Sequence, residues 1–83
     1  MNSIYHQQIV DAGGIDPLIN LLTHKDPDIK KDAVFVLGEL ALNSNYHQQI
    51  VDAGGIDPLM KLLRDEDPVI QSNAGVVLGK LVL

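Results

Sequence analysis

Three kinds of side chain in this sequence could carry out chemistry: histidines, clustered carboxylates and serines. His6 and His47 lie 41 residues apart, but a zinc site needs more ligands than two imidazoles and the chain has no cysteine. Residues 65–67 read Asp-Glu-Asp, whereas calcium loops space their carboxylates at alternate positions around a glycine. The serines lack the glycine elbow of a nucleophile. We therefore expect no catalytic residue, no metal, no cofactor and no enzyme activity.

Paired glycines are the remaining chemical candidate, because the stretch AGGIDP occurs at residues 12–17 and again at 53–58. Glycine-rich loops can bind phosphate at a helix N-terminus, but they carry a lysine and a serine or threonine at a fixed spacing that is missing here. The stretch instead predicts a corner: a helix ends at a glycine with positive φ, and aspartate and proline begin the next helix. The predicted corner residues are Gly13, Gly14, Asp16 and Pro17, with their equivalents Gly54, Gly55, Asp57 and Pro58.

Composition limits the classes of protein further. The chain has 83 residues, enough for one small domain, and a net charge of −5. An acidic chain without a basic stripe repels a phosphate backbone, so nucleic acid is not an expected partner. The apolar runs are far too short to cross a membrane, and the first residues have no signal-peptide pattern. We expect a soluble, cytoplasmic protein.

An internal repeat organises the whole chain. When residues 2–42 are aligned with residues 43–83, 27 of the 41 positions are identical. Identity is 16 of 17 over residues 2–18 but only 11 of 24 over residues 19–42. A repeat of this length is typical of a helical solenoid. We therefore predict one domain made of a first repeat at 1–42 and a second at 43–83.

Each repeat is predicted to contain three helices. The first covers residues 5–12 or 46–53, and the second covers residues 17–22 or 58–63. The third is the longest and begins after Asp26-Pro27 or Asp67-Pro68. Its apolar residues recur at helical spacing, at Ile29, Ala33, Val36, Leu37 and Leu40. The predicted fold class is all-α, an α-solenoid of two three-helix repeats.

This pattern resembles the armadillo repeat over the whole chain. The match is carried by Ile50, Ala53, Gly54, Ile56, Pro58, Leu59, Leu62, Leu63, Ala74 and Leu78. The resemblance implies a superhelix whose third helices line a concave groove that, in many members, binds extended peptides through asparagines and tryptophans. By position, those asparagines fall on Glu39 and Lys80, and the tryptophans on Phe35 and Val76. A carboxylate only accepts and an ammonium only donates, so neither residue replaces an amide.

Variation between the repeats is concentrated on one helical face. Lys31, Phe35 and Glu39 are spaced four apart, and all three differ from their equivalents Ser72, Val76 and Lys80. Two explanations remain open. Exposed positions can simply vary without consequence, or the face can be specific for a partner.

The two ends of the array are predicted to be apolar and uncovered, because repeats bury their faces against neighbours. No following repeat covers the end of the last helix, with Val77, Leu78, Leu81, Val82 and Leu83; no preceding repeat covers Ile4, Tyr5 and Ile9. We expect the chain to associate with itself. The expected form is a closed homodimer that joins C-terminal repeats, with or without exchanged helices, whereas head-to-tail stacking would leave the assembly open.

Two functions follow from these patterns. The first is a non-enzymatic, self-associating structural unit, favoured by the near-identical repeats and by the lack of polar terminal caps; such repeats are typical of an engineered, reconstructed or excised unit. The alternative is a module that binds a peptide or protein on its concave third-helix face. The expected partners are another copy of the chain, then a peptide or protein.

Overall fold

The computed structural model describes residues 3–82, and all described secondary structure is helical. The first repeat contains α1 (Ser3–Asp11), α2 (Ile15–Leu21) and α3 (Pro27–Leu40). The second contains the short η1 (Ser44–Tyr46), α4 (His47–Asp52), α5 (Ile56–Leu62) and α6 (Pro68–Val82). Predictions for Leu83 and for the side chains of Ile4 and His6 lie outside the described residues. The predicted all-α solenoid fold is confirmed.

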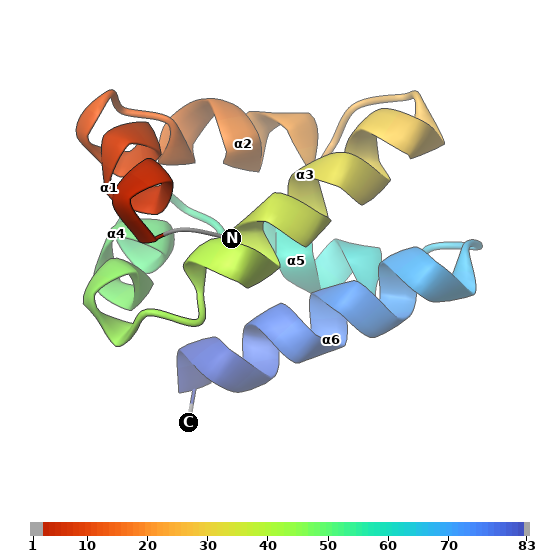
Figure 1. Ribbon diagram of the computed structural model, residues 1–83. Coiled ribbons are helices and arrows are strands. Elements are labelled where there is room, and N and C mark those ends of the chain that lie inside the picture. Colours follow the sequence, from red (N-terminus) through yellow and green to blue (C-terminus); the bar gives the residue numbers. More distant parts are fainter. Residues whose placement is uncertain (1–2, 83) are drawn as a thin grey trace.

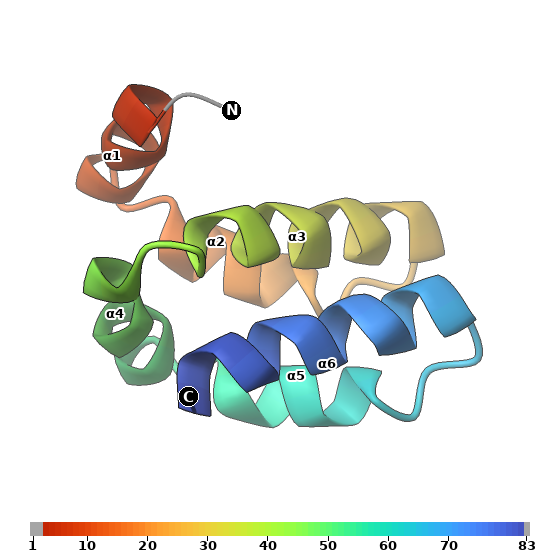
Figure 2. The same cartoon turned by 60° about the horizontal axis from the view of Figure 1, so that its bottom comes forward.

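The two repeats stack directly on each other. Figures 1 and 2 show α3 and α6 running side by side in the same direction, with α1 above α4 at one end of the molecule. The core lies between the layers, where α3 packs on α6 and α2 packs on α4. Its fully buried side chains include Val34, Leu37, Leu40, Ile50, Leu59 and Ile70. Within residues 3–82 there is no helix of the length and hydropathy needed to span a membrane.

Both glycines of each AGGIDP corner are required by the backbone. Gly13 and Gly54 have φ angles of 77° and 80°, which confirms the predicted left-handed conformation. The Gly54 amide donates to the Val51 carbonyl at 3.0 Å, and the Gly55 amide donates to the Ile50 carbonyl at 3.0 Å. This pair of bonds is the Schellman motif, in which a helix ends and its last carbonyls are satisfied. The first corner repeats the motif, with Gly14 donating to Ile9 at 2.8 Å.

Asp16 and Asp57 do not cap the second helices, contrary to the prediction. These helices begin earlier, at Ile15 and Ile56, and their N-cap residues are Gly14 and Gly55, which make no side-chain cap bond. The helix starts as soon as the chain leaves the corner, because the carbonyl of Gly14 accepts from Leu18 at 3.2 Å. Both aspartates still lie in the first turn, where a negative charge complements the helix dipole.

The second Asp-Pro pair in each repeat does begin a helix as predicted. Asp26 Oδ1 accepts from the backbone N–H of Asp28 at 2.9 Å, and Asp67 Oδ1 accepts from that of Val69 at 2.8 Å. Pro27 is the first residue of α3, where the missing N–H costs nothing. These caps fix where the long third helices begin and therefore which residues share their faces.

Candidate interaction surfaces

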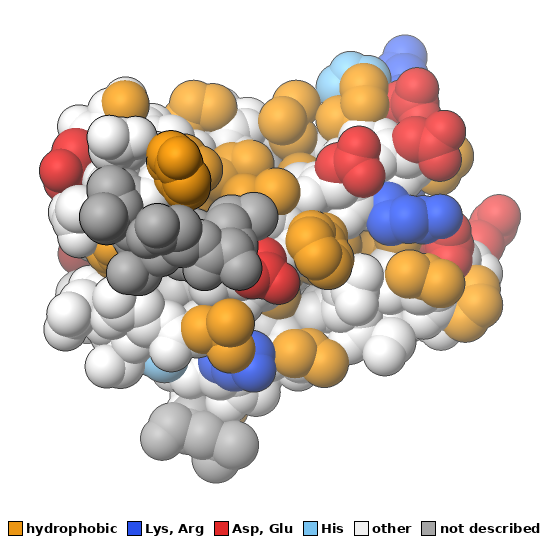
Figure 3. Space-filling model, viewed as in Figure 1, with side chains coloured by type: hydrophobic (Ala, Val, Ile, Leu, Met, Phe, Trp, Pro, Cys, Tyr) orange, Lys and Arg blue, Asp and Glu red, His pale blue; other side chains and the backbone are white. Residues whose placement is uncertain are grey.

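A groove of about 240 Å³ runs between the C-terminal halves of α3 and α6. We define it by its lining residues: Val34, Phe35, Gly38, Glu39, Leu42, Asn73, Val76 and Lys80. Phe35 and Val76 are 56% and 50% exposed, so both present apolar surface to solvent. Figure 3 shows hydrophobic side chains together with groups of both charges on the face formed by these helices. The groove is therefore amphipathic.

Four of the six residues predicted for the groove face line this groove: Phe35, Glu39, Val76 and Lys80. The ion pairs found among the described residues do not join Glu39 to Lys80. Lys31 does not line the groove and instead lies 3.4 Å from Asp67. Ser72, its equivalent, is exposed and also lies outside the groove lining.

Asn73 and Leu42 also line the groove, although the sequence interpretation did not include them. Asn73 is half-buried, and its amide can both donate to and accept from a peptide backbone. It lies three residues before Val76 and seven before Lys80, which places it on the same helical face. That spacing could have identified it. Its equivalent in the first repeat is Asp32, so the amide occurs once.

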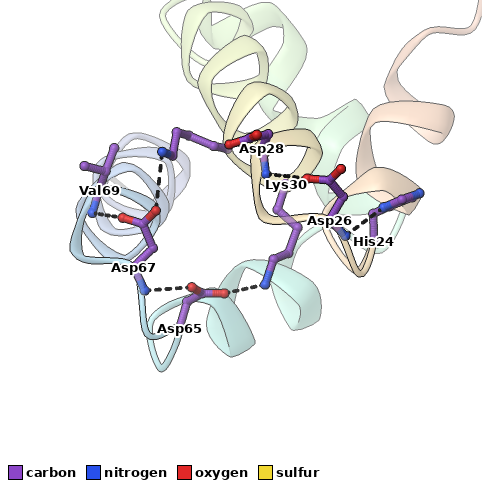
Figure 4. Close-up of polar contacts among 8 residues, drawn as sticks. His24, Asp26, Asp28, Lys30, Asp65, Asp67 and Val69 are labelled. Atoms are coloured by element: carbon purple, nitrogen blue, oxygen red, sulfur yellow. Dashed lines mark hydrogen bonds and ion pairs between the residues drawn. The ribbon is translucent and has the colours of Figure 1, made fainter.

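At the opposite edge, a polar cluster joins the two repeats (Figure 4). We define this inter-repeat cluster as Lys30, Lys31, Asp65 and Asp67. Lys30 Nζ donates to Asp65 Oδ2 at 2.6 Å, across the boundary between the repeats. Asp65 Oδ1 also accepts from the backbone N–H of Asp67 at 2.9 Å. In the first repeat the position equivalent to Asp65 is His24. Its Nδ1 accepts from the backbone N–H of Asp26 at 3.0 Å, as Asp65 Oδ1 accepts from that of Asp67.

These contacts lower the pKa of both aspartates. The hydrogen bond from Lys30 holds the pKa of Asp65 below its ordinary value of 3.8, with a further contribution from the Asp67 backbone N–H. The pKa of Asp67 is lowered mainly by the backbone N–H of Val69 and then by Lys31, and desolvation opposes both effects. The folded state therefore holds these carboxylates ionised more strongly than the unfolded chain does.

We expect the free energy of unfolding to fall in acid, partly because of Asp65. A carboxylate with a lowered pKa stabilises the fold at pH values above its unfolded pKa and loses that contribution as the pH falls through the folded pKa. Urea unfolding of Asp65→Asn between about pH 6 and pH 3 should show a weaker pH dependence than the parent chain. Glu66→Gln, an exposed neighbour, is the control. Identical pH dependence in Asp65→Asn and the parent would contradict this assignment.

The two ends of the stack expose apolar side chains. At the N-terminal end, Tyr5 is 60% and Leu21 is 37% exposed. At the C-terminal end, Met60, Leu63 and Val82 are 52%, 38% and 73% exposed. Leu78 and Leu81, which also lie near the C-terminal end of the stack, are partly buried because they pack against the core.

Val77 was predicted for the uncovered C-terminal surface, and the structure places it elsewhere. Its side chain is only 1% exposed, because it points from α6 toward α3. Its Cγ2 atom would lie 3.5 Å from a Cβ atom at Gly38. Val77 therefore belongs to the interface between the repeats, and it is not available to a partner.

The fold and corners define an armadillo-repeat α-solenoid. A family model of helical-repeat proteins, Cnd1, described as non-SMC mitotic condensation complex subunit 1, matches residues 1–82. The chain therefore belongs to this family. No curated protein sequence matches it.

Several solved structures are similar to the chain. An engineered protein is 37% identical with a TM-score of 0.89, over 94% of this chain and 19% of that one. A designed armadillo repeat protein is 30% identical with a TM-score of 0.88, over 96% of this chain and 34% of that one. A computationally designed armadillo repeat protein for modular peptide recognition is 28% identical with a TM-score of 0.89, over 96% of this chain and 34% of that one. The chain thus spans between 19% and 34% of the length of these proteins.

Proposed function

We propose that the chain is a non-enzymatic repeat module that associates with copies of itself through the two ends of the stack. The observation that carries the proposal is the apolar character of both ends, with Tyr5, Met60 and Val82 more than half exposed. Exposed apolar side chains that cluster mark association sites. Stacking is also the way in which helical repeats cover such faces.

Sedimentation velocity over a dilution series tests this proposal. We expect the weight-average mass to rise with protein concentration, because association follows mass action. Val82→Glu should weaken association, since it places a charge on the C-terminal end. Val69→Glu is the matched control, because Val69 is 50% exposed. Its equivalent Asp28 stays exposed although the second repeat covers the first, so position 69 is not expected to lie in the association surface. A folded monomer of constant mass at every concentration would contradict the proposal.

A second function is supported by the groove, which we propose to bind an extended peptide. Phe35 and Val76 offer apolar contacts, Asn73 offers an amide, and Glu39 and Lys80 offer opposite charges. The similarity to a designed protein for modular peptide recognition supports the same function. A peptide with apolar and charged side chains would suit this lining better than a purely apolar one.

Charge reversal in the groove is expected to change ligand preference. Lys80→Glu should bind an acidic-apolar test peptide more weakly, and a basic-apolar peptide of equal length more tightly, by up to about fivefold for an exposed charge pair. Fluorescence anisotropy with labelled peptides measures both affinities. Lys25→Glu is the control because Lys25 is exposed but lies outside the groove. Equal affinities of Lys80→Glu and the parent for both peptides would remove the groove as a binding site.

A further inference from the structure

Equivalent residues in the two repeats differ sharply in exposure at the faces that point toward the N-terminal end. Tyr46 is 3% exposed, whereas its equivalent Tyr5 is 60% exposed. Leu62 is 4% exposed, whereas its equivalent Leu21 is 37% exposed. The side chains are identical in both pairs. The difference arises because the first repeat covers this face of the second repeat, whereas no element among residues 3–82 covers the same face of the first.

The faces that point toward the C-terminal end show the reverse pattern. In the first repeat, Leu22, Ile19 and Ala41 are 1%, 5% and 2% exposed, because the second repeat covers them. Their equivalents Leu63, Met60 and Val82 are 38%, 52% and 73% exposed. The chain therefore exposes, at its two ends, counterparts of both halves of the interface that it buries in its middle.

We infer that the C-terminal end of one copy docks on the N-terminal end of a second copy, head to tail, by repeating the interface between its own two repeats. This inference rests on the proposed self-association and specifies its geometry as open stacking, in place of the closed homodimer expected from the sequence. The C-terminal face is defined by Met60, Leu63, Leu78, Leu81 and Val82, and the N-terminal face by Tyr5, Ile9, Leu18, Leu21, Ile29 and Val36.

The shape of the N-terminal face supports this docking. It contains a shallow depression lined mainly by apolar residues of α2 and α3, among them Leu18, Leu21 and Val36. The equivalent residues Leu59, Leu62 and Val77 form the surface on which the first repeat packs, and they are at most 4% exposed. A second copy would fill the depression with the equivalents of the side chains that cover this surface internally.

Individual contacts across the internal interface also have counterparts at the ends. Ile19 reaches the second corner, where its Cδ1 atom would lie 3.1 Å from a Cβ atom at Gly55. The equivalent contact would join Met60 of one copy to Gly14 of the next. Because glycine is present at both residue 14 and residue 55, Met60 would have the same room at the junction that Ile19 has at the internal interface.

A hydrogen bond at the internal interface can form again at the junction. Tyr46 Oη donates to Gln7 Oε1 at 2.8 Å. The equivalent bond would join Tyr5 of the second copy to Gln48 of the first. Gln48 is already oriented for this role, because its Nε2 donates to Asp52 Oδ1 at 2.7 Å, as Gln7 Nε2 donates to Asp11 Oδ1 at 2.7 Å.

The inter-repeat polar cluster has no counterpart at the junction. Gln71 and Ser72 stand where the first repeat has Lys30 and Lys31, and His24 stands where the second has Asp65. Gly75 also replaces the buried Val34. The junction therefore keeps most of the apolar contacts and loses both ion pairs. It should be weaker than the internal interface, so association is reversible and each added copy leaves one free face for the next.

Complementation between two blocked variants tests the geometry. Met60→Glu blocks the C-terminal face and Leu21→Glu blocks the N-terminal face. Every head-to-tail junction needs one face of each kind, so each variant alone should associate at least about 100-fold more weakly, because a carboxylate would be buried without a partner. Mixed in equal amounts, the two should form a 1:1 dimer that does not grow, since one pair of intact faces remains.

Sedimentation velocity of each variant and of the mixture distinguishes the outcomes, with circular dichroism to confirm folding. If Leu21→Glu dimerises alone while Met60→Glu does not, copies pair through their C-terminal ends, and the head-to-tail geometry is wrong. If the parent chain associates but the mixture stays monomeric, the geometry is again wrong and self-association stands. If the parent chain never associates, self-association itself fails. Should either variant unfold, Val82→Glu and Tyr5→Glu replace the pair, because these side chains are 73% and 60% exposed.

Ser72→Lys provides a test by gain of affinity. The introduced ammonium would face Asp26 of the next copy, as Lys31 faces Asp67 at 3.4 Å within the chain. Head-to-tail association should tighten by up to about fivefold, the range of an exposed ion pair, and the gain should disappear in high salt. Unchanged association in low salt would contradict the proposed register.

Discussion

Replacing Leu37 by alanine is expected to lower the free energy of unfolding by about 2–5 kcal/mol, the range measured for buried leucines. Leu37 is fully buried in α3, the helix that packs on both α2 and α6. Removing its side chain leaves a cavity between the repeats, in addition to the lost transfer free energy. Urea unfolding at low protein concentration measures the effect.

Leu78→Ala is the matched control, because Leu78 is the equivalent leucine in the second repeat. It is only partly buried among the described residues. Its replacement should therefore cost clearly less than Leu37→Ala in the dilute protein. The difference should become smaller at high concentration, since association covers the C-terminal face. Equal costs at low concentration would contradict the assignment of a covered and an uncovered face to the two repeats.

Replacing Gly55 by alanine is expected to destabilise the fold by about 2–4 kcal/mol, from steric overlap and a weakened hydrogen bond. A Cβ atom at Gly55 would lie 2.9 Å from the carbonyl oxygen of Ile50 and 3.1 Å from Ile19 Cδ1. The carbonyl cannot move away without breaking the bond that it accepts from the Gly55 amide at 3.0 Å. The overlap therefore distorts the corner and the contact between the repeats together.

Gly54→Ala is the control for this prediction, because the neighbouring glycine is required for a different reason. A Cβ atom at Gly54 would meet nothing within 4 Å, but its φ of 80° is unfavourable for any other residue. That strain should cost about 1 kcal/mol. Thermal or urea unfolding of both variants separates the two effects. If Gly54→Ala proved the more damaging of the two, the steric account of Gly55 would be wrong.

The parts of the fold that could be predicted from sequence are those that depend on local backbone chemistry. The positive φ of Gly13 and Gly54 follows from the helix-ending pattern, and the starts of α3 and α6 follow from Asp26-Pro27 and Asp67-Pro68. The same Asp-Pro pattern was misleading at Asp16 and Asp57. There the corner leads directly into the next helix, and a residue pattern alone does not show that the glycine ends one helix and begins another.

Burial could not be predicted in the same way, because it depends on which neighbour covers a face. Val77 lies in the apolar run at the end of the chain, yet it points toward α3 and is buried. Tyr5 and Tyr46 have nearly identical sequence surroundings and opposite exposure. Asn73 was not predicted because it lies outside the i, i+4 series of Ser72, Val76 and Lys80, although its spacing of seven residues from Lys80 places it on the groove face.

Nuclear magnetic resonance of the ¹⁵N-labelled chain over a dilution series tests the central claim most directly. The claim is that the two ends of the stack are docking surfaces for further copies. The account predicts amide shift changes with concentration at both ends, around Tyr5 and Leu21 and around Met60 and Val82, while the groove around Phe35 and Val76 stays unchanged. Spectra that do not change with concentration, or that change only in the groove, would contradict it.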